Sequence, residues 1–379
     1  MTSKVLFISN GTGEDLNSNQ VLQALQNLAP QIEIMALPVV GEGRAYQVPL
    51  LVSGRSLPSR GFLYMSSREL LKDLQAGLIG LTLTQINSLL RHRGKFDLVL
   101  ATGDVVVLAM AWLTGCPYAA FLVSASAYYE NRFALPLPTN FLLRSRQCRQ
   151  IFCRDRYTAE LCQAQGLTHA VFAGYPIMDL LHYAQPRLQL HPDLPLVAFL
   201  PGSRLPEACQ NLGLILELAK LITIPLQFYG AIVPAMQPEL AAIATAHGWQ
   251  YDQGAFTYQH IQVHCRSDMF AEILDRANLV VGMAGTAVEQ AVGLGKPVVQ
   301  LVGQGPQFTY RFAEAQMRLL GKSVHTCSNP MQAAALIPQI LQDQAYLAAC
   351  KANGADRVGH PGGSQAIAQR LLKLIEYKK

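Results

Sequence analysis

Short apolar runs alternate along the chain with longer segments in which apolar residues recur every three to five positions. The first run, residues 5–9, ends at a glycine-rich turn, and the segment after it has helical spacing: Leu16, Val21, Leu22, Leu25 and Leu28. Further runs lie at residues 32–37, 96–101, 118–123 and 150–153. Nearly continuous apolar strands that alternate with helices are typical of parallel sheets covered on both faces.

A second series of the same kind begins at residues 196–200. It continues with a helix at 205–222 and with strands at 226–229, 279–281 and 297–301. A proline-containing segment, residues 183–195, separates the two series and has the composition of a linker. The pattern therefore predicts an α/β protein whose ligands bind beyond the carboxyl ends of parallel strands.

The length of the chain, 379 residues, suits two domains better than one core. We place an N-terminal domain at residues 1–185 and a C-terminal domain at 190–360, with an interdomain cleft. The last helical segment, residues 364–379, is expected to pack back on the N-terminal domain.

Composition narrows the class of protein. Apolar residues make up 50% of the chain and charged residues 15%, which excludes a disordered chain. The net charge of +5 comes without the charge runs of a nucleic-acid-binding tail, so no nucleic-acid partner is expected. The eight cysteines form no Cys-x-x-Cys pair, which favours a reducing compartment. With no signal-peptide pattern and no run of about 18 apolar residues, we expect a cytoplasmic protein.

The loop after the strand at 196–200 has the residues of a phosphate site. Gly202 allows a sharp turn, Ser203 and Arg204 follow it, and Pro206 suits the first turn of a helix. Free N–H groups at a helix start attract anions, and Arg204 adds a cation with bidentate geometry. The alternative is an ordinary strand-to-helix loop with Arg204 in a salt bridge.

The loop after the strand at 279–281 has a similar character. Gly285 and Thr286 let a backbone approach a ligand at a helix start, and Glu289 follows in the first turn. Its carboxylate could accept both hydroxyls of a ribose, or it could only compensate the helix dipole. Together the two loops indicate a nucleotide site, which neither indicates alone.

Three segments in order, residues 174–179, 201–207 and 285–299, resemble the motif series of the lipid-A disaccharide synthase family, and most closely that of the lipid-A-disaccharide-synthase-related proteins. The resemblance implies a GT-B fold of two Rossmann-like domains, with a UDP-sugar donor held by the C-terminal one. It implies that Arg204 faces the diphosphate and Glu289 the ribose. Gln304 or Gln307, in the segment after the last donor-site strand, could meet the donor sugar or diphosphate, or could be plain loop amides.

The same resemblance implies that the N-terminal domain holds the acceptor and the catalytic base. Asp104, after the strand at 97–100, matches the aspartate proposed as the general base, although it could also cap the following helix. Gly13, Glu14 and Asp15 lie in the turn after the first strand and could contact the acceptor or the leaving group. Glu14 and Asp15 could instead be ordinary acids of a first helical turn.

The chain departs from the family at residues 124–132, where the family has a tryptophan-containing segment, so the acceptor half carries over less well than the donor half. Residues 55–95 mix basic and apolar side chains, which suits contact with an anionic membrane or an ordinary solvated helix face. No metal framework is evident, and no cofactor is expected beyond the UDP-sugar itself, which is a substrate.

We therefore expect a glycosyltransferase, specifically an inverting hexosyltransferase, that moves a sugar from a UDP-sugar to a lipid-linked or amphipathic acceptor. One alternative is a UDP-sugar epimerase of the same architecture, which would release UDP without an acceptor. The other is a non-catalytic relative that binds a nucleotide-sugar or a lipid and regulates a partner.

Overall fold

The computed structural model describes residues 2–53, 78–129, 134–303 and 309–376. The chain divides into two compact units. Unit 1 comprises Met1–Asp179 together with Pro361–Lys379, and unit 2 comprises Leu180–His360. Unit 2 is therefore one continuous piece of chain, whereas unit 1 is built from two.

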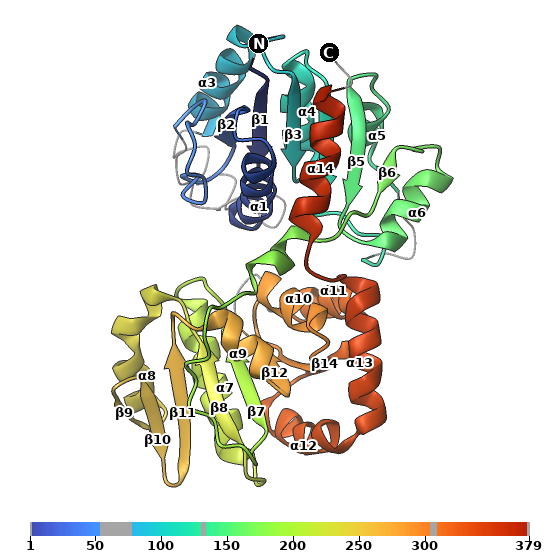
Figure 1. Ribbon diagram of the computed structural model, residues 1–379. Coiled ribbons are helices and arrows are strands. Elements are labelled where there is room, and N and C mark those ends of the chain that lie inside the picture. The colour runs from blue at the N-terminus through green and yellow to red at the C-terminus, as the bar shows by residue number, and fades with distance from the viewer. Residues whose placement is uncertain (1, 54–77, 130–133, 304–308, 377–379) are drawn as a thin grey trace. The chain divides into compact units, whose positions relative to one another are not determined.

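Among its described residues, unit 1 contains one parallel sheet with the strand order β2-β1-β3-β4-β5-β6 (Figure 1). The strands are β1 (Lys4–Ser9), β2 (Glu33–Pro38), β3 (Leu98–Thr102), β4 (Tyr118–Leu122), β5 (Cys148–Cys153) and β6 (Ala170–Val171). One face is covered by α1 (Thr12–Leu28) and α14 (Gly363–Glu376). The other is covered by α3 (Leu78–Arg91), α4 (Val105–Leu113), α5 (Leu137–Leu143) and α6 (Arg156–Ala164).

The sheet described in unit 2 has the order β14-β13-β12-β7-β8-β11-β10-β9. Its strands are β7 (Leu196–Leu200), β8 (Gln227–Ala231), β9 (Gln250–Asp252), β10 (Ala255–Tyr258), β11 (Ile261–Arg266), β12 (Leu279–Gly282), β13 (Val298–Leu301) and β14 (Val324–Cys327). The pairing is parallel from β14 to β11. The parallel sheets expected from the sequence are thus confirmed, and β10 adds antiparallel pairing with β9 and β11 at one edge.

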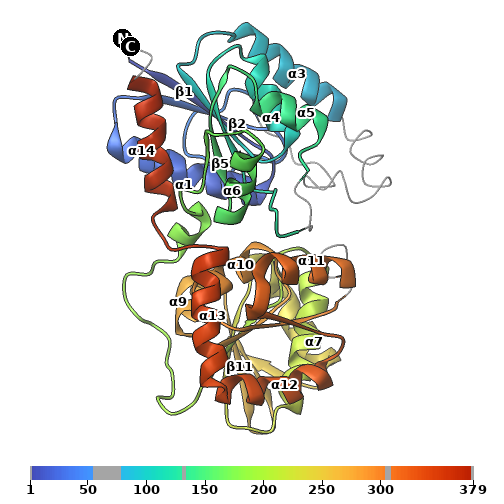
Figure 2. The same ribbon diagram turned by 90° about the vertical axis from the view of Figure 1, so that its right-hand side faces the viewer.

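Helices cover both faces of the unit 2 sheet as well (Figure 2). One layer contains α7 (Glu207–Leu221), α8 (Leu240–Ala246) and α12 (Pro330–Gln342). The other contains α9 (Phe270–Arg276), α10 (Thr286–Gly293) and α13 (Gln344–Arg357), with α11 (Tyr310–Leu320) beside β14. Because both faces are covered, every residue of β7 and β12 is buried, which explains their continuous apolar sequences.

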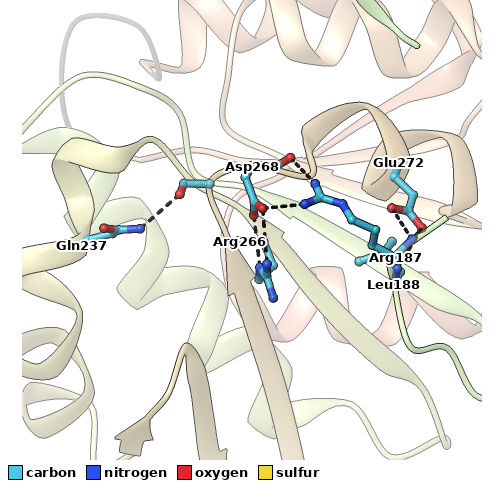
Figure 3. A network of polar contacts seen from close by, with 7 residues as sticks. Arg187, Leu188, Gln237, Arg266, Asp268 and Glu272 are labelled. Carbon is cyan, nitrogen blue, oxygen red and sulfur yellow. Dashed lines mark hydrogen bonds and ion pairs between the residues drawn. The ribbon is translucent and has the colours of Figure 1, made fainter. Parts of the chain in front are cut away.

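The proline-containing segment 183–195 is bound to unit 2 (Figure 3). The buried Glu272 carboxylate accepts hydrogen bonds from the backbone N–H groups of Arg187, at 2.8 and 3.0 Å, and of Leu188, at 2.9 Å. The Arg187 guanidinium pairs with Asp268 at 3.0 Å, and the Tyr183 hydroxyl donates to Asp275 at 2.7 Å. The segment therefore has fixed partners although it has no regular secondary structure.

The two pieces of chain that build unit 1 contact each other next to the points where the chain passes into unit 2 and back. The Asp179 carboxylate accepts hydrogen bonds from the backbone N–H groups of Gly362 and Ser364, the latter at 2.7 Å. A Cβ on Gly174 would lie 2.6 Å from the Gly363 Cα, so this approach requires glycine. These contacts fix the start of α14, which packs along α1.

Candidate functional site

Each sheet has a point at which its strand order reverses direction. In unit 1 this point lies at β1, between β2 and β3, and in unit 2 at β7, between β8 and β12. At such a point the loops after neighbouring strands lead to helices on opposite faces, and ligands of open α/β sheets bind there. The site residues expected from the sequence that fall in the described ranges lie in or directly after the loops that follow β1, β3, β7 and β12.

The loop between β7 and α7 is shaped by Gly202. Its φ of +103° is strained for other residues, and a Cβ there would lie 2.9 Å from the Met283 carbonyl oxygen in the loop after β12. The Asn211 side chain donates to the Pro201 carbonyl at 3.0 Å and holds the loop to α7. Arg204 is half-buried just before this helix begins, and Ser203 is exposed.

The loop between β12 and α10 is held by hydrogen bonds from a side chain of α11. Gln316 of α11 donates through Nε2 to the carbonyls of Ala284, at 3.2 Å, and Gly285, at 3.1 Å. Gly285 is the N-cap residue of α10, and Thr286 is the first helical residue. Glu289 lies in the first turn and is only 8% exposed. No motif in the sequence marks Gln316, because its role depends on a fold contact about 30 residues away along the chain.

The structure thus brings the two predicted donor loops into direct contact within unit 2. Two helix N-termini and Arg204 supply positive charge in these loops, and the buried Glu289 carboxylate lies in the first turn of α10. This arrangement can bind a phosphate and a hydroxyl-bearing group together. Gln304 and Gln307 lie outside the described residues.

Asp104 follows β3 and is the N-cap residue of α4. Its Oδ1 accepts a hydrogen bond from the Val106 backbone N–H at 2.9 Å, so the capping role expected as an alternative is present. Its Oδ2 accepts one from the Asn10 side chain at 3.1 Å. Asn10, which the sequence did not identify, thereby links the ends of β1 and β3.

The adjacent acids Glu14 and Asp15 in α1 point to different neighbours. Glu14 accepts a hydrogen bond from the Ser124 hydroxyl after β4 at 3.0 Å. Asp15 is 5% exposed and accepts one from Ser9 at the end of β1 at 2.6 Å. Burial raises the pKa of the Asp15 carboxyl to about 7, and the nearby Glu14 charge adds to the shift. The Gly13 carbonyl accepts a hydrogen bond from Asn17 and stays within the helix.

The segment in which the chain departs from the family is attached to β5 and α6. Ser126 donates to the buried Asp155 carboxylate at 2.7 Å, and the Ala127 N–H donates to Thr158 at 2.9 Å. The buried Arg154 guanidinium donates to the Val123 carbonyl at 3.2 Å. Polar side chains of Arg154 and Asp155, between β5 and α6, and of Thr158 in α6 therefore hold residues 123–127. Residues 130–132 of the segment lie outside the described part of the chain.

No group of three or more His, Cys, Asp or Glu side chains among the described residues is placed to hold a metal ion. No helix in the described ranges is long and apolar enough to cross a membrane.

Two α/β units, each with a mainly parallel sheet and with polar residues where its strand order reverses, have the architecture of the GT-B class of fold. The fold agrees with the glycotransferase of kitacinnamycin, with a TM-score of 0.62 at 14% identity over 99% of this chain and 100% of that one. It also agrees with the UDP-GlcNAc 2-epimerase of Neisseria meningitidis bound to UDP-GlcNAc, with a TM-score of 0.56 at 16% identity over 99% of this chain and 100% of that one. The expected GT-B fold is therefore confirmed.

Among curated proteins, the chain is similar to the lipid-A-disaccharide synthase of Xylella fastidiosa strain M23. The two are 26% identical over 214 residues, which are 54% of this chain and 53% of the relative. The chain thus spans about half the length of the curated relatives it matches. No family model matches it.

Proposed function

We propose that the protein is a glycosyltransferase that moves a sugar from a UDP-sugar to the hydroxyl of a lipid-linked or amphipathic acceptor. The observation that carries this proposal is the close approach of Gly202, in the loop after β7, to the Met283 carbonyl, in the loop after β12 that leads to Gly285. In this proposal the helix starts and Arg204 bind the diphosphate, and Glu289 binds the ribose hydroxyls. Similarity to lipid-A-disaccharide synthases supports the transfer reaction over other uses of the fold.

The proposed reaction is a single displacement that inverts the anomeric carbon. The acceptor oxygen attacks this carbon, the bond to the phosphate oxygen breaks, UDP leaves, and Asp104 takes the hydroxyl proton. The family resemblance alone assigns Gln304 or Gln307 to the donor sugar or diphosphate, and Glu14 of α1 is assigned to the reacting groups. Helix N-termini and Arg204 stabilise the leaving diphosphate, so transfer is expected to persist in EDTA.

Calorimetry with UDP and the full chain tests the donor site. Arg204→Ala is expected to weaken UDP binding roughly 10-fold or more, because it removes hydrogen bonds to a charged group. Lys4→Ala, an exposed cation of unit 1 paired with Glu33, is the control and should bind UDP like the wild type. Absence of UDP binding to the wild type would contradict the proposal.

Transfer from radiolabelled UDP-sugars to membrane lipids tests the reaction itself. Asp104→Asn keeps a good N-cap residue but removes the base, so it should fold normally and lose roughly 100-fold or more in turnover. Asp104→Ala should lose both stability and turnover. UDP release without any acceptor would favour the epimerase, and UDP binding with no turnover would favour a non-catalytic relative.

We also propose that the protein contacts the cytoplasmic face of a membrane. Residues 55–77 of the expected surface lie outside the described part, but α3 exposes Ile79 and Leu83, which are 60% and 55% accessible. Arg91 ends this helix, and the exposed Arg93 and Lys95 follow. A helix with exposed apolar residues that ends in cations suits anionic lipid. Sedimentation with anionic but not zwitterionic vesicles is expected, and equal recovery with both would contradict this contact.

A further inference from the structure

A cavity lies in unit 1 between the first turn of α1 and the loop after β2. Its volume is about 520 Å³, which is within the usual range for small-molecule sites. The α1 side of its wall includes Gly11, Thr12 and Asp15, and the opposite side is formed by residues 40–45. Three of the lining residues are glycines with positive φ, Gly11, Gly41 and Gly43, so much of the wall is backbone.

The Asp15 carboxyl is the most deeply buried polar group of this wall. Ser9 donates to its Oδ1 at 2.6 Å, and the buried Tyr46 hydroxyl meets the Ser9 oxygen at 2.5 Å. Because the Ser9 hydrogen is directed at Asp15, Tyr46 is the donor of the second bond. A Cβ on Gly41 would lie 4.0 Å from Asp15 Oδ2, so this oxygen is near the loop that forms the opposite side of the cavity. One carboxyl oxygen is thus fixed and the other lies toward the cavity wall.

The charges of the wall favour a neutral ligand over an anion. Besides Asp15 the wall carries Glu42, and its cation Arg44 already pairs with Glu42 at 2.7 Å. An anionic group would meet two carboxyl groups and one neutralised cation, and the acids of the first turn, Glu14 and Asp15, offset the positive end of the α1 dipole. Hydroxyl groups can donate to carboxylates, while the apolar face of a sugar ring can pack on Leu16 and Val40, which also line the cavity.

We propose that this cavity binds the neutral, hydroxyl-bearing sugar of the acceptor, and that Asp15 accepts a hydrogen bond from one of its hydroxyls. The inference rests on the proposed transferase function and assigns Glu14 and Asp15 to separate tasks. Glu14 lies toward Ser124 and Gly103, beside the Asp104 end of the sheet, whereas Asp15 lies toward Ser9 and the cavity. The acceptor sugar therefore lies over the ends of β1 and β2.

Saturation-transfer NMR with octyl β-D-glucopyranoside, below its micelle concentration, tests binding without UDP or turnover. Asp15→Asn keeps an oxygen for Ser9 but removes the carboxylate, so it should weaken glycoside binding roughly 10-fold or more. Ala45→Phe fills part of the cavity from the opposite wall and should weaken it similarly. Glu33→Gln, an exposed acid at the start of β2, is the matched control and should bind like the wild type.

Three results would overturn the inference: octanol binds as well as the glycoside, inorganic phosphate binds more tightly than it, or Asp15→Asn leaves glycoside affinity unchanged. In the transfer assay, Asp15→Asn should raise the acceptor KM while calorimetric UDP binding stays the same. If the wild type binds the glycoside but not UDP, the transferase proposal fails and the sugar site stands. If it binds UDP but not the glycoside, only the sugar site fails.

Discussion

At the scale of single residues, Asp15 carries an electrostatic cost. Taking a carboxyl group out of water disfavours its charged form, and here burial outweighs the hydrogen bond from Ser9, which acts in the opposite direction. Glu14 beside it in the chain adds a like charge. A buried acid with a raised pKa beside a cavity is typical of a functional position, because a neutral side chain would stabilise the fold more simply.

The titration of Asp15 predicts how stability depends on pH. Its pKa rises from 3.8 to about 7 on folding, so between these values the native state binds more protons than the unfolded state. The stabilisation from this group is therefore complete below about pH 4 and is lost as the pH rises through 7, by up to about 4 kcal/mol. Asp15→Asn lacks this loss and should gain stability relative to the wild type at pH 8.

Urea unfolding of both proteins at pH 5 and pH 8 measures this difference. Histidines and other groups that titrate in the same window are common to both proteins and cancel in the comparison. Equal changes in the free energy of unfolding between the two pH values would show that the Asp15 carboxyl is ionised in the native state throughout. A gain in stability together with weaker glycoside binding is a combination that a purely structural role for Asp15 would not produce.

At the scale of elements, segment 183–195 and helix α9 form one structural piece. Two backbone N–H groups of the segment, at Arg187 and Leu188, donate hydrogen bonds to the Glu272 carboxylate. Glu272 is only 2% exposed. Hydrogen bonding from Arg266 lowers the pKa of Asp268, which also pairs with Arg187 on the surface. The buried contacts carry most of the stabilisation, because exposed ion pairs contribute little.

Removing the Glu272 carboxylate should therefore destabilise unit 2 more than removing Asp268. Glu272→Ala removes a buried carboxylate and its partly buried hydrogen bonds from Arg187 and Leu188, and each hydrogen bond to a charged group contributes about 1.5–3 kcal/mol. Asp268→Ala removes an exposed partner and is expected to cost at most about 1 kcal/mol. Urea unfolding of the two variants gives the comparison, and a cost for Asp268→Ala equal to that for Glu272→Ala would refute the ranking.

The same segment shows what could be predicted from the sequence and what could not. Glycine and proline mark turns locally, so the loops after β7 and β12 were predicted together with the strands before them, although the helix expected from 205 begins at Glu207. Prolines also indicated that 183–195 lacks regular structure, but the acceptor for its N–H groups lies about 85 residues away in the chain. Asn10, Gln316 and Tyr46 were missed for the same reason. Consecutive helical residues differ by about 100° in direction, so the sequence predicts that Glu14 and Asp15 point apart. It does not predict which of the two faces the cavity.

At the scale of the whole molecule, the two units differ in how the chain builds them. Unit 2 is continuous and has its own core between β7, α7 and α12, together with both candidate donor loops. Unit 1 needs α14, whose residues Ile367, Ala368, Leu371 and Ile375 are buried. Asp179 also takes its partners from the second piece of chain. The fold therefore allows one unit, but not the other, to be cut out as a single segment.

Residues 180–360 alone should fold cooperatively and bind UDP with the affinity of the full chain, provided that the proposed donor site is correct. Residues 1–179 should not fold alone, because losing three large aliphatic side chains of α14 removes about 5 kcal/mol or more, comparable to the stability of an entire domain. Adding residues 361–379 as a separate peptide should restore the fold, since residues 1–179 still contain the α1 residues on which α14 packs in the native unit. Calorimetry and thermal unfolding of each fragment measure these outcomes. If the 180–360 fragment folds but fails to bind UDP while the full chain binds it, residues outside unit 2 belong to the donor site.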